Sequence, residues 1–124
     1  MTNFKGTREA FAAAMMDMAE ERKDIVVISP DSLKAMRAVP FGEKYPDRYL
    51  ECGIAEQGAV DAAAGLASAG LTPFIGTYCG FLTMRACEQM RTFVGYTNLN
   101  VKFVGVNAGL LGGEREGVTH QFYE

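Results

Sequence analysis

The chain has 124 residues, of which 48% are hydrophobic and 22% are charged, and its formal net charge is -3. This length allows one domain with a core of ordinary size, and the composition is that of a soluble globular protein, not of a disordered chain. The acidic balance, with a pI near 5.2, argues against a nucleic-acid partner and against an anionic membrane surface.

The cysteines and the N-terminal residues indicate the compartment. Cys52, Cys79 and Cys87 are odd in number and lack C-x-x-C spacing, so they predict neither a disulfide framework nor a zinc site. Reduced thiols in a cytoplasm are the simplest account of them. Residues 1–5 lack the apolar core of a signal peptide, and no stretch is long enough to span a membrane. We therefore expect a cytoplasmic protein.

The first third of the chain predicts a helix, a strand and an irregular segment. We expect the helix over residues 8–22, with Thr7 as its N-cap, because its larger apolar side chains fall on one face. Residues 25–28 are a continuous β-branched run, which is typical of a strand buried on both faces. Residues 33–47 are polar and irregular, with one helical turn expected over residues 41–44.

The rest of the chain alternates between strands and helices. Strands are expected over residues 48–52, 72–76 and 101–106, and helices over residues 56–70 and 80–93. Strands that alternate with helices of this length predict an α/β fold. Its parallel sheet would form the middle of three layers, with helices on both faces.

Four loops should meet at one edge of this sheet, because the carboxyl ends of parallel strands lie together. These loops cover residues 29–32, 52–56, 76–81 and 106–120, and they hold nearly all the unusual residues of the chain. Ligands of open α/β sheets bind at this edge. The sequence therefore predicts a binding site there, on positional grounds alone.

Five short runs resemble one known family in their order and spacing. They are Thr7-Arg8-Glu9-Ala10, Lys23-Asp24-Ile25-Val26-Val27, Gly53-Ile54-Ala55-Glu56-Gln57, Tyr78-x-x-Phe81-x-x-x-Arg85-Ala86-x-Glu88-Gln89 and Thr119-His120-Gln121. Together they resemble the pyrimidine-binding domain of transketolases, which use thiamine diphosphate. The resemblance is strongest to the C-terminal subunit of transketolases that are split into two chains. It covers residues 1–124 and implies a single domain that is incomplete at its C-terminal end.

The resemblance implies a catalytic role for Glu56. In the family, a carboxylate at this position hydrogen-bonds the aminopyrimidine ring nitrogen of the cofactor and favours its imino tautomer. An acid is required, because glutamine would hold the ring without shifting the tautomer. Without the resemblance, the simpler interpretation of Glu56 is a carboxylate that stabilises the start of a helix through the helix dipole.

Further cofactor contacts are implied for one acidic and three apolar or aromatic residues. Tyr78 and Phe81 would form the aromatic wall for the pyrimidine, and Met84 takes a third position that is often aromatic in the family. Asp31 matches an acidic residue near the cofactor. From the residues alone, the aromatic spacing also fits core packing, and Asp31 also fits a turn after Pro30.

The remaining matches concern the sugar substrate. His120, the only histidine, would lie at the substrate channel and take part in catalysis, and Arg8 would hold a substrate phosphate. Both residues could otherwise be ordinary surface residues. Asn107 stands where the family usually has a histidine that contacts the sugar, and Glu116 takes the place of a family aspartate. We therefore expect ketol transfer that involves an unusual sugar donor or acceptor.

A family motif that this chain lacks indicates a partner. The Gly-Asp-Gly motif and the later asparagine, which bind Mg²⁺ and the diphosphate in the family, are absent from the sequence. We expect them on a diphosphate-binding transketolase subunit, so this chain should supply no metal ligands. It should form a dimer or a larger homo- or hetero-oligomer, and it should be inactive alone.

Two other interpretations stay open. The first is a beta-type subunit of a 2-oxo acid decarboxylase or dehydrogenase component, whose family shares part of the pattern. The second is a non-catalytic assembly module. Retention of Glu56 together with the aromatic pair argues against the second interpretation, because a scaffold has no need for a carboxylate at this position.

Overall fold

The computed structural model describes residues 6–109 and 120, and these form alternating helices and strands. The helices and strands are α1 (Thr7–Glu21), β1 (Ile25–Ser29), α2 (Val39–Lys44), β2 (Tyr49–Glu51), α3 (Glu56–Ser68), β3 (Thr72–Tyr78), α4 (Cys87–Gln89) and β4 (Lys102–Val106). The described residues also form the 3-10 turn η1 (Pro46–Arg48) and the π-helical segments η2 (Phe81–Arg85) and η3 (Met90–Gly95).

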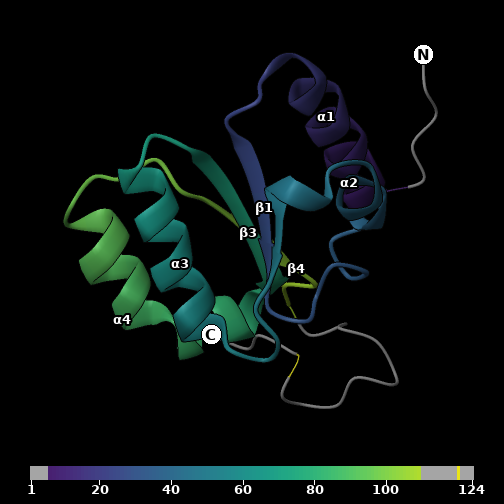
Figure 1. Ribbon diagram of the computed structural model, residues 1–124. Helices are drawn as coiled ribbons and strands as arrows, with labels where there is room; N and C mark the ends of the chain where they lie inside the picture. Colours follow the sequence, from purple (N-terminus) through teal and green to yellow (C-terminus); the bar gives the residue numbers. More distant parts are fainter. Residues whose placement is uncertain (1–5, 110–119, 121–124) are drawn as a thin grey trace.

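The four strands form one parallel sheet in the order β2-β1-β3-β4. Its two central strands, β1 and β3, are the most buried, as the run of β-branched residues in β1 predicts for that strand. Helices α1 and α2 lie on one face of the sheet, and α3 and α4 lie on the other (Figure 1). The predicted three-layer α/β fold is therefore confirmed.

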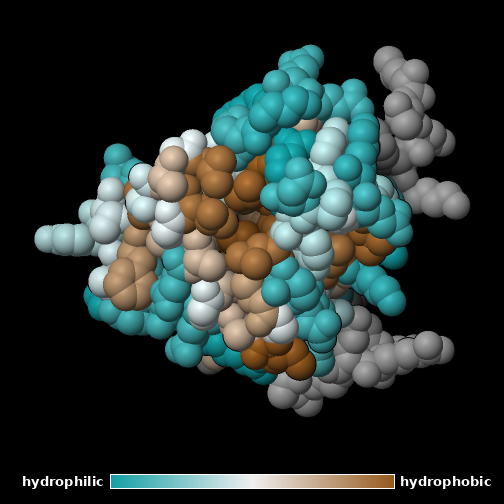
Figure 2. Space-filling model, in the orientation of Figure 1, coloured by the Kyte–Doolittle hydropathy of each residue, from teal (hydrophilic) through white to brown (hydrophobic). Residues whose placement is uncertain are grey.

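The two faces of the sheet are packed differently. Towards α3 four of the nine buried core residues are alanines, and the small side chains of Ala59 and Ala63 let this helix lie close to the strands. Towards α1 and α2 the core holds larger side chains, among them Met15, Met36 and Phe41. Figure 2 shows hydrophobic residues gathered in the middle of one face, between these two helical layers. The exposed Leu50 belongs to the edge strand β2.

Several predicted boundaries were wrong, most of them by one or two residues, and three of the differences have a local cause. Thr7 is the first helical residue, not the N-cap; the N-cap is Gly6, in an extended conformation and without a side-chain hydrogen bond. Strand β3 continues to Tyr78, two residues beyond the prediction, because β4 pairs with it through Tyr78 opposite Val106. The single helix predicted over residues 80–93 is divided, because Ala86 leaves the helical conformation with φ -107° and ψ 18°.

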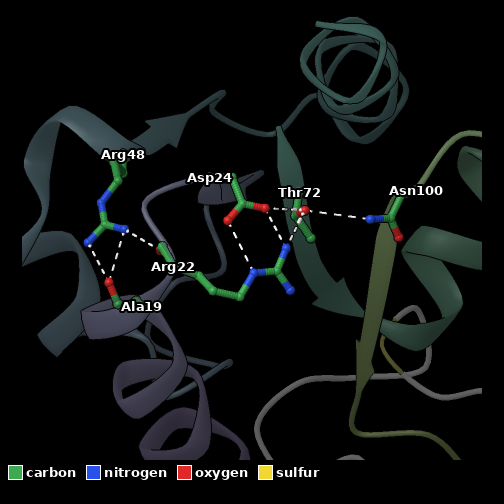
Figure 3. Close-up of polar contacts among 6 residues, drawn as sticks. All are labelled: Ala19, Arg22, Asp24, Arg48, Thr72 and Asn100. Atoms are coloured by element: carbon green, nitrogen blue, oxygen red, sulfur yellow. Dashed lines mark hydrogen bonds and ion pairs between the residues drawn. The ribbon is translucent and has the colours of Figure 1, made fainter. Parts of the chain in front are cut away.

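A polar network ties together the amino ends of the strands, at the edge opposite the predicted site (Figure 3). Arg22 donates to both carboxylate oxygens of Asp24 and, at 3.0 Å, to Thr72 Oγ1. Thr72 Oγ1 in turn donates to Asp24 Oδ2 at 2.6 Å. Arg48 completes the end of α1 by donating to the carbonyl oxygens of Ala19 and Arg22 at 3.1–3.2 Å.

This network predicts a loss of stability in acid. Hydrogen bonds from Arg22 and then from Thr72 lower the pKa of Asp24 from 3.8 to about 2. Because the folded pKa lies below the unfolded one, the network's stabilisation is full above the unfolded pKa and is lost as the pH falls towards about 2. Urea unfolding of wild type and Asp24→Asn, measured from about pH 6 to about pH 2, should show the two stabilities converging in acid. A constant difference in stability across this range would contradict the prediction.

Candidate active site

Glu56 is the first residue of α3, and its side chain is only 6% exposed. The turn before it depends on Gly53, whose φ of 65° favours glycine, and on a hydrogen bond of 2.8 Å from Ala55 N–H to Gly53 O. The start of α3 borders a pocket of about 360 Å³, lined by residues 54–58 and Arg85. A buried carboxylate therefore faces a space large enough for part of a small molecule.

Three aromatic side chains predicted for the site lie in contact with one another. The ring centroids of Tyr78, at the end of β3, and Phe81, at the start of η2, are 5.6 Å apart. His120 approaches Tyr78 edge-on at 4.7 Å and Phe81 at 4.8 Å. The structure thus brings together one histidine and two aromatic rings from distant parts of the chain, which we name the aromatic cluster.

Arg85 connects the carboxylate to the aromatic cluster. Its Nη1 donates to Glu56 Oε1 at 3.1 Å, and its Cζ lies 3.8 Å from the ring centroid of Phe81. The Arg85 side chain is 45% exposed. Arg85 belongs to one of the five short motifs, but no role was predicted for it. The available signal was its position four residues after Phe81, since residues with this spacing can share a helix face.

Glu51 organises the loops beside Glu56, a role that no pattern in the sequence predicted. Its Oε1 accepts hydrogen bonds from the backbone N–H groups of Asp31 at 2.7 Å and Gly53 at 2.9 Å, and its Oε2 accepts one from the Tyr49 hydroxyl. Burial raises the pKa of the Glu51 carboxyl, but these hydrogen bonds outweigh burial and lower it overall. A charged Glu51 therefore joins the loops that follow β1 and β2.

The other predicted site residues lie in different surroundings. Arg8 and Asn107 line one pocket of about 510 Å³ between the start of α1 and the end of β4. Arg8 Nη1 also donates to the carbonyl oxygen of Ala35 at 3.2 Å. Met84 is 61% exposed. Glu116 lies outside the described residues.

Asp31 is exposed and adopts a left-handed conformation with φ 53°. Its backbone N–H, bonded to Glu51, ties its loop to the loop that precedes Glu56. Among residues 6–109 and 120, no group of three or more acidic, cysteine or histidine side chains could hold a metal ion. Within the same residues, no helix is both long and apolar enough to cross a membrane.

Fold and site define a parallel α/β domain with a buried acid and an aromatic cluster at the carboxyl edge of its sheet. Residues 5–124 match the family model described as the transketolase pyrimidine binding domain. The chain belongs to this family, which confirms the resemblance found in its motifs.

Curated relatives include a section of a transketolase and a 1-deoxy-D-xylulose-5-phosphate synthase. A putative transketolase C-terminal section of Methanocaldococcus jannaschii is 33% identical over 121 residues, which are 98% of this chain and 38% of that protein. A 1-deoxy-D-xylulose-5-phosphate synthase of Brevibacillus brevis is 44% identical over 111 residues, which are 90% of this chain and 17% of that protein. The chain thus spans less than two fifths of either relative.

A solved structure described as a split gene transketolase, an inactive beta4 tetramer, has a similar fold. Its TM-score is 0.76 at 36% sequence identity, over 92% of this chain and 36% of that one. The similarity extends beyond the fold class to the sequence of a divided transketolase.

Proposed function

We propose that this chain is part of a thiamine diphosphate-dependent transketolase-like enzyme that transfers a two-carbon ketol unit between sugars. The observation that carries the proposal is Glu56, a buried carboxylate at the start of α3 beside a pocket and linked through Arg85 to Phe81. Family membership supports the transketolase class.

The described residues fit the pyrimidine half of the cofactor. Glu56 Oε1 already accepts a hydrogen bond from a planar nitrogen cation, so it can accept one from a planar nitrogen heterocycle. The bound cofactor would supply the electron sink of the reaction. Glu56 would hold the proton at the pyrimidine ring nitrogen, and an ionisable side chain is required for that task.

The aromatic cluster would orient the pyrimidine and border the path of the substrate. Phe81 and Tyr78 offer aromatic surface at the end of β3, with Met84 and Asp31 as further proposed cofactor contacts. His120 lies against both rings, so its imidazole would stand between the cofactor site and the sugar. An imidazole there can donate a hydrogen bond to a sugar hydroxyl or carbonyl group.

The sugar would be bound by residues on the α1–β4 side of the domain. Arg8 and Asn107 line the same pocket, and Arg8 carries a guanidinium suited to a phosphate. Glu116 would complete this side. Since Asn107 and Glu116 differ from the residues usual in the family, we propose that the donor or acceptor sugar is also unusual. Ligands for Mg²⁺ and the diphosphate would come from a partner subunit.

The test is reconstitution of the enzyme. Purified full-length chain should show no ketol transfer alone, and activity should appear with the diphosphate-binding partner, thiamine diphosphate and Mg²⁺. The ketose donors assayed should include xylulose 5-phosphate, with ribose 5-phosphate as acceptor, and sugars that bear other anionic groups. Turnover by the chain alone would contradict the proposed assembly. Full activity with xylulose 5-phosphate and ribose 5-phosphate alone would contradict the proposal of an unusual sugar.

A second candidate function is favoured by one observation, the 44% identity to a 1-deoxy-D-xylulose-5-phosphate synthase. The same reconstituted enzyme distinguishes it, because this function would appear as formation of 1-deoxy-D-xylulose 5-phosphate. A requirement for a lipoyl protein would instead indicate a 2-oxo acid decarboxylase component. Failure of the assembled complex to bind thiamine diphosphate would indicate an assembly module.

A further inference from the structure

The Arg85 side chain makes the two contacts that a bound aminopyrimidine would need. Its guanidinium donates to Glu56 Oε1 at 3.1 Å, and its Cζ lies 3.8 Å from the centroid of the Phe81 ring. At this distance the guanidinium is placed for a cation–π contact with the ring. One planar group therefore occupies both the carboxylate and the aromatic surface that the proposed function assigns to the cofactor.

Guanidinium and aminopyrimidine have similar chemistry at this site. Both are planar and delocalised, both carry N–H donors in their plane, and both can lie against an aromatic ring. We propose that Arg85 occupies the pyrimidine position in the unloaded chain and must leave it when the cofactor binds. This inference rests on the proposed function and adds a device that controls loading of the same site.

Burial explains why such an occupant would be retained. The Glu56 side chain is 6% exposed, so its carboxylate would lose much of its hydration without a partner. Arg85 supplies the missing positive charge and hydrogen bond while the site is empty. An incoming ring has to replace both contacts, so Arg85 lowers the apparent affinity of the chain for the cofactor.

Exposure and local structure allow Arg85 to leave. Its side chain is 45% exposed, so the guanidinium can regain water when it swings away. It ends the π-helical segment η2, and the chain leaves the helical conformation immediately afterwards at Ala86. Because π-helical turns are rare and often mark functional sites, this segment suits a side chain with two positions.

Calorimetry on the full 124-residue chain tests the proposal, with the probe 4-amino-5-hydroxymethyl-2-methylpyrimidine, which is the pyrimidine fragment of the cofactor. Arg85→Met keeps an unbranched apolar stem and removes the competing planar cation. We expect it to bind the probe about tenfold or more tightly than wild type, because a charge-assisted competitor is gone. The matched control is Arg91→Met, which replaces an exposed arginine that is paired with Glu88. The affinity of this variant for the probe should equal that of wild type.

Nuclear magnetic resonance supplies a second readout that does not depend on activity. The guanidinium resonances of Arg85 should carry a ring-current shift from Phe81 in the free chain and lose it on saturation with the probe. Retention of that shift at saturation would overturn the proposal, because it would show that Arg85 stays against the Phe81 ring in the loaded state. Equal or weaker probe binding by Arg85→Met, or no binding by any variant, would also overturn it.

Failure of this inference is distinguishable from failure of the proposed function. Ketol transfer by the assembled wild-type enzyme, combined with no gain in affinity in Arg85→Met, would overturn the inference alone. A gain in probe affinity in Arg85→Met, combined with no ketol transfer by any assembled complex, would overturn the proposed function alone. Thermal unfolding of both arginine variants would identify a change in affinity that arises from misfolding.

Discussion

Glu56→Gln is expected to lower ketol transfer by the assembled enzyme by a factor of about 10² to 10⁴, the usual contribution of a positioned acid or base. Glutamine keeps the size and the hydrogen-bonding oxygen of the side chain but cannot exchange a proton with the pyrimidine ring nitrogen. The carboxylate is 6% exposed, so little water is at hand to replace it. Steady-state assays of the reconstituted complex, together with calorimetry for thiamine diphosphate, measure the effect.

Cofactor affinity should change much less than turnover in this variant, because the amide can still contact the ring. The matched control is Glu43→Gln, which makes the same change at an exposed residue of α2, on the other face of the sheet. Its activity should equal that of wild type. Full activity of Glu56→Gln would remove the carboxylate from the proposed chemistry.

Phe81→Ala is expected to weaken thiamine diphosphate binding by the assembled enzyme by roughly 10- to 100-fold. Aromatic stacking on a flat heterocycle contributes about 1–3 kcal/mol where it has been measured for nucleic-acid bases. Phe81 also contacts His120 at 4.8 Å, so its loss would loosen this neighbouring group of the site. Calorimetric titration of the complex with the cofactor in the presence of Mg²⁺ checks this prediction.

The control for this variant is Phe93→Ala, at a phenylalanine that is 45% exposed on η3. It removes the same aromatic group outside the proposed site, and cofactor affinity should be unchanged. Equal affinities of Phe81→Ala and wild type would show that the aromatic cluster does not bind the pyrimidine.

The predicted helix over residues 80–93 shows where sequence patterns stop being informative. Apolar periodicity indicated a helical segment there, and the structure is helical on both sides of Ala86. Periodicity could not distinguish an α-helix from the wider π-helical turns of η2 and η3, because both place every third to fifth residue on one face. It also could not locate the break at Ala86, whose side chain is fully buried.

Glu51 and Arg85 show the same limit for the site. Each is an ordinary charged residue within its own segment. Glu51 gains its role from the backbone N–H groups of Asp31, 20 residues away, and of Gly53. Arg85 gains its role from Glu56, 29 residues away. Hydrogen bonds over such separations depend on how the loops meet, which no local pattern records.

The sequence by itself determined the alternation of helices and strands, the parallel three-layer sheet, the family, and the position of Glu56 at the start of a helix. These features follow from local periodicity, β-branched runs and short motifs, which act within one element or across one turn. Only the tertiary structure decided that His120 lies against Tyr78 and Phe81 and that Arg85 pairs with Glu56. The physical reason is that these contacts join side chains from separate elements, so they exist only once the sheet and its helices have packed.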